Sequence, residues 1–251
     1  MTGRDLQILE ILSTHQRLKV NSLADMLDVS QVTVRKDLDG LEEAGFIRRV
    51  HGHATLEGID ELKRCMVNNY STKRRIAIAA AQNVKENETV MLESCPCCAF
   101  LAEELVTTKK NITIVTNSVF IADYIRNKPN VKIILLGGYY QPASQITVGS
   151  ITVKCAETFF LDKFFIGADG FMPDFGFSGR EHMRAVTAIE LAELAKETFV
   201  LLESAKFHNQ GVLHLLRFDK IAGVYTDEGI PEEAEAILLE NKVQLRKVPA
   251  C

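Results

Sequence analysis

From residue 71 onward, short apolar runs alternate with longer segments in which apolar residues recur at helical spacing. This alternation is typical of βαβ units, in which helices cover both faces of a parallel sheet. The fold class is therefore α/β, with a parallel-sheet domain over residues 71–251. The strands are predicted at 89–93, 112–116, 131–136, 163–168, 198–203, 220–225 and 243–247. The helices are predicted at 71–83, 98–108, 117–127, 151–159, 182–196 and 231–240.

The first 56 residues have a different pattern, with three short helices followed by a hairpin. Apolar spacing predicts a first helix that ends near His15, a second capped by Asn21 and a third capped by Ser30. Gly45 ends the third helix, and the hairpin turn falls at residues 51–54. This order is typical of a winged helix-turn-helix. The predicted divisions are a winged helix-turn-helix domain at 1–56, a linker at 57–70 and the α/β domain at 71–251.

The third helix has a charged side opposite an apolar stripe of Val34, Leu38 and Leu41. A recognition helix needs this arrangement, because its N-terminal residues must reach bases and phosphates while the other side stays buried. Asp37 would repel phosphate, so we expect it to pair with an arginine of the same domain. The residues expected to contact DNA are Ser30, Gln31, Val32, Thr33, Arg35 and Lys36 on the helix, and Arg48, Arg49 and His51 on the wing.

Net charge alone does not point to DNA. The chain carries a formal charge of −4 at pH 7, and residues 1–56 contain seven Lys or Arg against eight Asp or Glu. DNA binding therefore depends on where the cations lie. Helical trios with charged outer faces also occur in domains that bind no DNA, and periodicity alone leaves that alternative open.

The residues that follow the predicted strands of the α/β domain are small, polar or charged. In an open parallel sheet, ligands bind in the crevice at the carboxyl ends of the strands, and small residues there let the backbone approach a phosphate. One such turn is a weak signal, whereas their joint occurrence predicts a ligand site. The candidates are Glu93, Ser94, Thr116, Asn117, Ser118, Gly137, Gly138, Asp169, Gly170 and Lys206.

Three of the six cysteines crowd at Cys95, Cys97 and Cys98. Thiolates bind soft metals and oxidise reversibly, so a redox or metal sensor is one interpretation of this loop. Structural zinc sites usually combine two spaced cysteine pairs, and neither a second pair nor an obvious histidine partner is apparent. We therefore predict no metal and no cofactor, with small-residue packing or an altered ligand pocket as the alternative interpretation.

The sequence favours a cytoplasmic protein. No apolar stretch approaches the ~20 residues that span a bilayer. The first five residues lead straight into a helical pattern without the features of a secretory signal. We expect mostly reduced thiols and no membrane association.

Residues 29–38 and 41–52 follow a long and specific pattern. They fit V-S-x-x-T-[IV]-R-[RKQ]-D-L and then L-E-x-x-G-x-[IL]-x-R-x-H-G. This pattern closely resembles the signature of the DeoR family of bacterial transcription regulators. His53 departs from it, since members usually carry a second glycine there. The resemblance implies that residues 1–56 bind operator DNA.

The α/β domain resembles the C-terminal effector domain of the same family. That domain is related to the ribose-5-phosphate isomerase and glucosamine-phosphate deaminase folds, and it typically responds to a phosphorylated sugar. By this resemblance Asp169 would hold sugar hydroxyls and Lys206 would hold the phosphate. Glu181 and Arg184 match an acid and a cation of the family site. Many members carry Lys at the position of Arg184. The matching runs are 165–170, 176–178 and 203–207.

One loop departs from the family pattern. Members usually carry a D/E-x-G-[ST]-[ST] run whose glycine and hydroxyls hold phosphate. Residues 93–98 of this chain read Glu-Ser-Cys-Pro-Cys-Cys, and Pro96 has no N–H to donate. Phosphate recognition by this loop is therefore expected to differ.

Together these observations predict a regulator without catalytic residues. It would repress a carbohydrate-metabolism operon as a dimer or tetramer on repeated half-sites of double-stranded DNA, and a phosphorylated sugar or related metabolite would modulate its affinity. An enzyme of the sugar-phosphate isomerase type, with Asp169 as acid or base, is the alternative, but it leaves the N-terminal domain unexplained.

Overall fold

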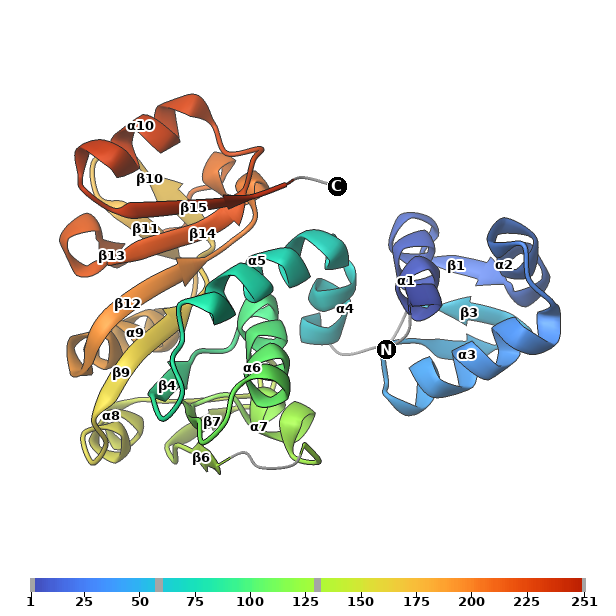
Figure 1. The fold of residues 1–251 in the computed structure, drawn as a ribbon, viewed down its shortest axis with the longest axis horizontal. Helices are drawn as coiled ribbons and strands as arrows, with labels where there is room; N and C mark the ends of the chain where they lie inside the picture. The colour runs from blue at the N-terminus through green and yellow to red at the C-terminus, as the bar shows by residue number, and fades with distance from the viewer. Residues whose placement is uncertain (1–2, 57–60, 129–131, 250–251) are drawn as a thin grey trace. The chain divides into compact units, whose positions relative to one another are not determined.

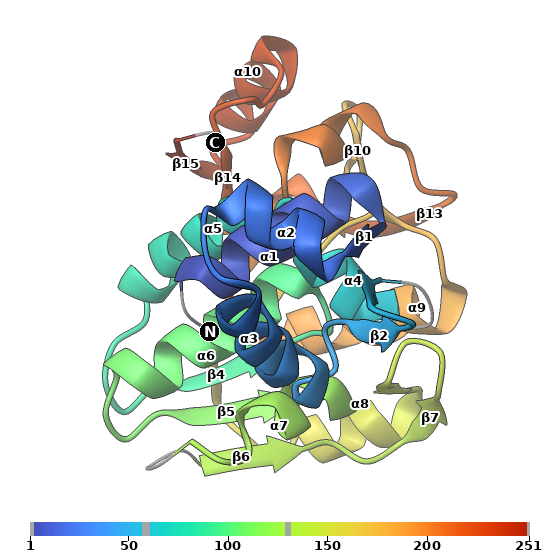
Figure 2. The ribbon, with the colours of Figure 1, turned by 90° about the vertical axis from the view of Figure 1, so that its right-hand side faces the viewer.

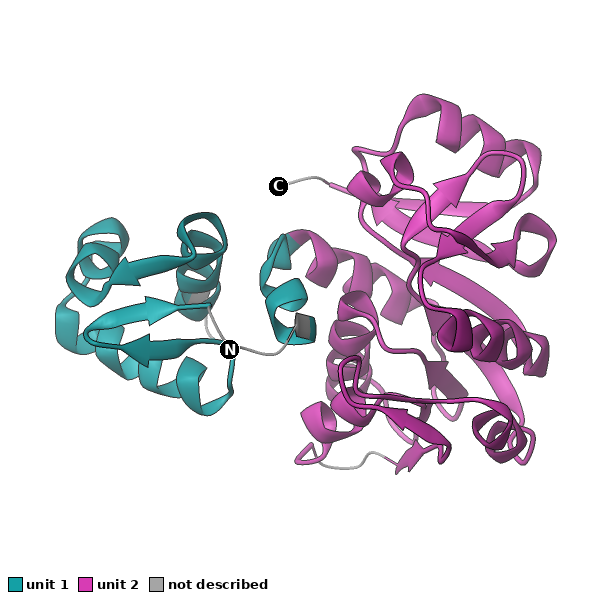
Figure 3. Ribbon diagram, turned by 180° about the vertical axis from the view of Figure 1, so that it is seen from behind, with its two compact units in different colours: residues 1–71 teal, residues 72–251 magenta. Residues whose placement is uncertain are grey.

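The chain divides into two units, residues 1–71 and residues 72–251 (Figure 3). The computed structural model describes residues 3–56, 61–128 and 132–249. Its elements confirm the predicted fold class, a helix-turn-helix with a wing followed by a parallel-sheet α/β domain. None of the helices within the described residues is long and apolar enough to cross a bilayer.

In the first unit, helices α1, α2 and α3 pack on a three-stranded antiparallel sheet of order β1-β3-β2 (Figure 1), and a fourth helix, α4, follows. Its core includes Leu9, Leu23 and Leu38, all fully buried. The elements are α1 (Gly3–His15), β1 (Arg17–Lys19), α2 (Val20–Leu27), α3 (Gln31–Glu43), β2 (Arg48–Val50), β3 (His53–Thr55) and α4 (Glu61–Val67). The predicted linker thus contains a helix, α4, while residues 57–60 lie outside the described residues.

The start of α2 differs from the prediction. The N-cap residue is Lys19, without a side-chain cap hydrogen bond, so the expectation that Asn21 caps this helix was wrong. The reason is that β1 runs directly into α2. The N–H of Val20 then donates to the carbonyl of Gly52 in the wing turn (3.1 Å), which satisfies a helix-terminal donor without a side chain.

The boundaries of α3 and of the wing turn follow the expected chemistry. Ser30 caps α3, and Gly45 follows its end with a φ of +73°. The wing turn is formed by His51 (φ 48°) and Gly52 (φ 76°). Two consecutive residues with positive φ suit the tight hairpin between β2 and β3, because that turn matches the twist of the strands.

The second unit is built on a seven-stranded sheet of order β15-β14-β12-β9-β4-β5-β6. All neighbouring strands run parallel. The chain first builds outward from β4 through β5 to β6 (Figure 2), and then returns to β9 on the other side of β4. The direction of building therefore reverses between β4 and β9, and such a switch point is where open α/β sheets bind ligands.

The strands of this sheet are β4 (Thr89–Leu92), β5 (Thr113–Thr116), β6 (Lys132–Leu135), β9 (Leu161–Ile166), β12 (Ala195–Leu201), β14 (Gly223–Asp227) and β15 (Gln244–Val248). The helices are α5 (Tyr70–Gln82), α6 (Pro96–Thr108), α7 (Val119–Ile125), α8 (Ser150–Ala156), α9 (His182–Leu194) and α10 (Glu232–Glu240), with 3-10 turns η1 (Ser204–His208) and η2 (Phe218–Lys220). Their apolar faces bury a core in which Phe164, Phe165 and Phe177 are fully enclosed.

Two small antiparallel sheets were not predicted. One pairs β7 (Tyr139–Gln141) with β8 (Ile146–Val148). The other joins β10 (Gly170–Met172), β11 (Gly176–Gly179) and β13 (Leu213–Arg217). These strands have three to five residues, which is too short for a readable alternation of apolar and polar positions.

Candidate functional site

The N-terminal end of α3 is an exposed polar surface. The hydroxyl of Ser30 accepts the N–H of Thr33 (3.1 Å), and the two hydroxyls lie 2.8 Å apart. Gln31, Arg35 and Lys36 are exposed, and Val32 is 75% exposed although it is apolar. An apolar side chain at this place suits contact with a thymine methyl group, and cations beside it suit guanine edges or phosphates.

Asp37 pairs inside the domain, which confirms the prediction. Arg4 of α1 donates to its carboxylate with Nε at 2.5 Å and with a second guanidinium nitrogen at 3.1 Å. The side chain of Asp37 is only 10% exposed. A bidentate pair of this kind neutralises an acid that lies on the element predicted to face DNA.

Arg49 is held by two carboxylates of α3. Its Nε donates to Glu42 at 2.7 Å, its Nη2 lies 2.6 Å from a carboxylate oxygen of Asp39, and its backbone N–H donates to Glu42 at 2.8 Å. The hydrogen bond from Arg49 lowers the pKa of the Glu42 carboxyl. Arg48 and His51, the other two wing residues predicted to contact DNA, are exposed.

The predicted effector residues at the switch point include a buried ion pair. Arg184, in the first turn of α9, donates to both carboxylate oxygens of Glu93 (2.5 and 2.8 Å) and to the carbonyl of Ser94 (2.5 Å). Glu93 directly follows β4 and is 1% exposed. Burial raises the pKa of the Glu93 carboxyl, and the attraction of Arg184 opposes this rise.

Asp169 and Lys206, two of the predicted effector residues, are half-buried. Asp169 follows β9 and is half-buried, near enough to Glu93 and Arg184 to affect both electrostatically. Lys206 lies in η1, after β12, and is also half-buried. Neither side chain forms an ion pair within the part of the chain that the structure describes.

The residues after β5 take part in internal hydrogen bonds. Thr116 donates to the carbonyl of Leu92 (2.6 Å), Ser118 to the hydroxyl of Ser94 (3.1 Å), and Asn117 through its amide to the carbonyl of Thr147 (3.0 Å). The Oδ1 atom of Asn117 is buried without a hydrogen-bond partner among the described residues. This acceptor therefore keeps unused hydrogen-bonding capacity within the described part of the domain.

Two of the predicted glycines allow close backbone approach. A Cβ on Gly138 would lie 1.9 Å from Oγ1 of Thr152, and one on Gly170 would lie 2.3 Å from the carbonyl oxygen of Asn209. Gly137, by contrast, is exposed and has only Cys155 near its Cβ position, at 3.9 Å. Packing therefore accounts for Gly138 and Gly170 without a ligand.

Glu181 acts as the N-cap of α9. Its carboxylate accepts the N–H groups of Met183 (3.1 Å) and Arg184 (2.6 Å). A carboxylate at this place satisfies two free donors and complements the helix dipole. Glu181 therefore fixes the helix turn that carries Arg184 to Glu93.

The cysteine loop forms the start of α6. The Sγ of Cys95 accepts the N–H of Cys98 (3.3 Å), the Cys98 thiol donates to the carbonyl of Phe165 (3.3 Å), and Pro96 is the first helical residue. Burial raises the pKa values of Cys97 and Cys98 well above the ordinary thiol value. Among the described residues, no group of three or more His, Cys, Asp or Glu could hold a metal ion.

One buried ion pair near this loop had no signal in the sequence. Lys73 of α5 lies 3.0 Å from a carboxylate oxygen of Glu203, and the two side chains are 7% and 11% exposed. Next to it along the chain, Ser204 donates to Asp227 through its hydroxyl (2.5 Å) and its N–H (2.8 Å). Glu203 and Asp227 could be noticed at strand ends, but Lys73 lies on a helix far from both in sequence.

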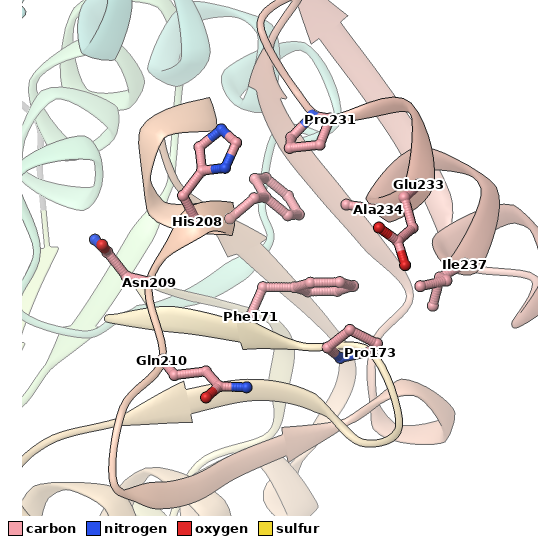
Figure 4. Close-up of a pocket in the computed structure, with 10 residues that line it drawn as sticks. Phe171, Pro173, His208, Asn209, Gln210, Pro231, Glu233, Ala234 and Ile237 are labelled. Carbon is pink, nitrogen blue, oxygen red and sulfur yellow. The ribbon is translucent and has the colours of Figure 1, made fainter.

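A surface pocket of about 260 Å³ lies between η1, β10 and α10 (Figure 4). Its lining includes Phe171, Pro173 and Ile237 together with the polar His208 and Glu233. None of the predicted effector residues lines it. This pocket therefore does not coincide with the predicted effector residues at the switch point.

Two family models cover the chain. The DeoR-like helix-turn-helix domain matches residues 4–58, and the DeoR C terminal sensor domain matches residues 68–228. The second match alone covers more than half of the 251 residues.

Relatives are similar over nearly their whole length. The HTH-type transcriptional regulator GolR of Listeria innocua is 29% identical, over 96% of this chain and 91% of its own. The HTH-type transcriptional repressor GlcR of Bacillus subtilis is 26% identical, over 96% of this chain and 94% of its own. Both are regulators by name rather than enzymes.

A solved structure similar to part of the chain is ribose 5 phosphate isomerase A from Neisseria gonorrhoeae. It is 18% identical with a TM-score of 0.38, over 54% of this chain and 52% of its own. The family assignment follows from the domain matches instead: this chain belongs to the DeoR family of helix-turn-helix transcriptional regulators.

Proposed function

We propose that the protein represses a carbohydrate-metabolism operon and that a phosphorylated sugar or a related metabolite, bound in the α/β domain, modulates its affinity for operator DNA. The observation that carries the DNA-binding part is the exposed N-terminal end of α3, with Gln31, Val32, Arg35 and Lys36 outward and Asp37 neutralised by Arg4. The name of the relative GlcR, a repressor, supports the direction of regulation.

In this proposal α3 enters the major groove. Arg35 and Lys36 contact guanine edges or phosphates, while Ser30 and Thr33 lie where the free N–H groups of a helix N-terminus attract phosphate. Arg48 and His51 contact the backbone from the wing. Arg49 acts through its ion pairs with Asp39 and Glu42, which hold the wing against α3.

The effector site lies at the switch point between β4 and β9. The carboxylates of Glu93 and Asp169 suit the hydroxyl groups of a sugar. The Oδ1 of Asn117, which has no hydrogen-bond partner among the described residues, would accept one more hydroxyl. Glu93 already neutralises Arg184, so Lys206 is the cation best suited to a phosphate.

The start of α6 is a poor phosphate site in this chain. Pro96 has no N–H, and the N–H of Cys98 is already bonded to Cys95. This assigns the phosphate end of the ligand to η1, which carries Lys206. Ser94 follows Glu93 at this switch point, whereas Gly137 and Gly138 follow β6, two strands away from β4, and Gly170 packs on Asn209.

The protein acts in the cytoplasm as a dimer or tetramer, because two recognition helices related by symmetry bind repeated half-sites. A ligand that favours one placement of the two helices changes operator affinity. Couplings of this kind are about 1–3 kcal/mol, or roughly 5- to 150-fold in affinity.

The test is a mobility-shift titration of the protein with its own upstream DNA, with and without a panel of sugar phosphates. We expect a specific shift that one sugar phosphate weakens, and a Lys206→Ala variant that binds DNA normally but no longer responds. Lys154→Ala, which removes an exposed charge from α8, is the matched control and should respond as the parent does.

Two outcomes would contradict the proposal. A response to oxidant or zinc alone would transfer sensing to Cys95, Cys97 and Cys98. Absence of any specific shift, together with isomerase turnover of pentose or hexose phosphates, would favour the enzyme alternative.

A further inference from the structure

The cations of the first unit divide into two groups. Residues 1–56 contain seven Lys or Arg, of which Arg4 pairs with Asp37 and Arg49 pairs with Asp39 and Glu42. The other five form no ion pair within the described residues. These five are Arg35 and Lys36 on α3, and Arg17, Lys19 and Arg48 on the wing sheet.

The strand register shows which face of the wing sheet packs on the helices. Residues opposite one another in antiparallel strands point to the same face, and successive residues alternate between faces. Leu18, Ala54 and Arg49 form one row across β1, β3 and β2. Ala54 is fully buried and Arg49 contacts α3, so this row lies on the helix side.

The rows on either side of it therefore point away from the helices. In the strand register, Arg17 of β1 and Arg48 of β2 both lie opposite Thr55 of β3, which is buried between them. Lys19 lies opposite His53. Arg17, Lys19 and Arg48 are exposed, and His53 is half-buried. We call these four residues the outer wing face.

The outer wing face is a compact positive surface beside the wing turn. Arg17 and Lys19 are two residues apart on one strand, about 7 Å, and Arg48 lies two strands away, about 10 Å. The two other residues in these rows are Val50 and Thr55, so none of the six residues in the two rows carries a carboxylate. The bond from Val20 to Gly52 fixes the end of β1 beside the turn.

We propose that the outer wing face binds the phosphate backbone of duplex DNA next to the bases that α3 reads. Three exposed cations with no carboxylate in their rows match a polyanion better than they match a mixed protein surface. The proposal rests on the proposed DNA-binding function, to which it adds Arg17 and Lys19. It places the contacts on the strand β1, which sequence reasoning missed, and assigns Arg49 to positioning.

The experiment measures operator affinity of an Arg17→Ala/Lys19→Ala variant by fluorescence anisotropy at 50, 100 and 200 mM KCl. Each phosphate contact contributes about 0.9 to the slope of log affinity against log salt, so we expect the slope to fall by about 1.8. The affinity deficit of the variant should therefore shrink roughly 12-fold between 50 and 200 mM. The ratio of operator to scrambled-duplex affinity should stay unchanged, because backbone contacts carry no sequence information.

Two control variants separate charge from fold. Lys154→Ala removes one exposed cation from the other unit and should keep the parent slope. The Arg17→Lys/Lys19→Arg variant keeps both charges and should also keep the parent slope of log affinity against log salt. A structural role of either side chain would instead change this slope. Circular dichroism of each variant checks that the fold is intact.

The outcomes distinguish this inference from the proposed function. If the parent protein binds the operator and the Arg17→Ala/Lys19→Ala variant binds with the same affinity and slope, the outer wing face has no DNA contact. If the parent binds no specific DNA at all, the proposed function itself is wrong.

Discussion

Replacing Arg184 with methionine should destabilise the α/β domain in a pH-dependent way. Glu93 is 1% exposed and would lose both hydrogen bonds to the guanidinium, which leaves a buried charge without compensation. Breaking such a pair costs about 3–5 kcal/mol, and the 31% exposure of the Arg184 side chain favours the lower end. For a domain of this size, about 3 kcal/mol corresponds to a fall in melting temperature of roughly 6–12 °C.

The sign of the pH dependence follows from Glu93. Burial already raises the pKa of this carboxyl, and removal of Arg184 takes away the interaction that opposes the rise. A carboxyl with a raised pKa binds its proton more tightly in the folded state, so stability falls as the pH rises above the ordinary carboxyl value. The deficit of the Arg184→Met variant should therefore be large at pH 7.5 and small at pH 5.

Urea denaturation of the parent, Arg184→Met, and Glu93→Gln/Arg184→Met at pH 5, 6 and 7.5 provides the measurement. The double variant carries no charge at positions 93 and 184, so it should recover part of the lost stability at pH 7.5 and lose the pH dependence that Glu93 causes. An equal deficit of the single variant at all three pH values, without recovery in the double variant, would refute the reasoning.

Other substitutions test the remaining contacts. Arg35→Ala should lose about 1–3 kcal/mol of specific operator binding without loss of fold, and an unchanged operator affinity in a mobility shift would exclude it from recognition. Glu181→Ala should lower thermal stability by about 0.5–2 kcal/mol, because two N–H groups of α9 lose their acceptor, and a melting curve identical to the parent would contradict that role. Iodoacetamide at pH 8 should label the exposed Cys65 and leave Cys97 and Cys98 unmodified, since burial keeps their thiols protonated. Mass spectrometry that finds all three cysteines labelled at similar rates would instead support a reactive cysteine loop.

Sequence periodicity was sufficient for the long regular elements. The helix expected at 182–196 is found at His182–Leu194, and the one expected at 98–108 at Pro96–Thr108. The strand β1 was missed because three residues between two helices have no readable period. The same short strand explains the wrong cap at Asn21, since the backbone of the wing turn took the place of a capping side chain.

The sequence predicted where the candidate residues lie in the fold better than it predicted which contacts their side chains make. The positions after β4, β9 and β12 follow from the parallel sheet, and Glu93, Asp169 and Lys206 lie there. The use of each side chain depends on neighbours that are remote in sequence. Arg49 was predicted to contact DNA, and that prediction stays untested; its register and its ion pair with Glu42 place it in the row beside α3, which could not be read from the letters of a three-residue strand.

The division of cations in the first unit also affects how the protein finds its target. The whole chain carries −4, so its net charge provides no long-range attraction to DNA, and the exposed arginines and lysines act only within a Debye length of about 8 Å at physiological salt. Association should then proceed without electrostatic steering, at about 10⁵–10⁶ M⁻¹s⁻¹. Discrimination between an operator and the rest of a genome would reside in the lifetime of the bound complex, and changes in operator sequence should alter that lifetime while leaving the encounter rate almost constant.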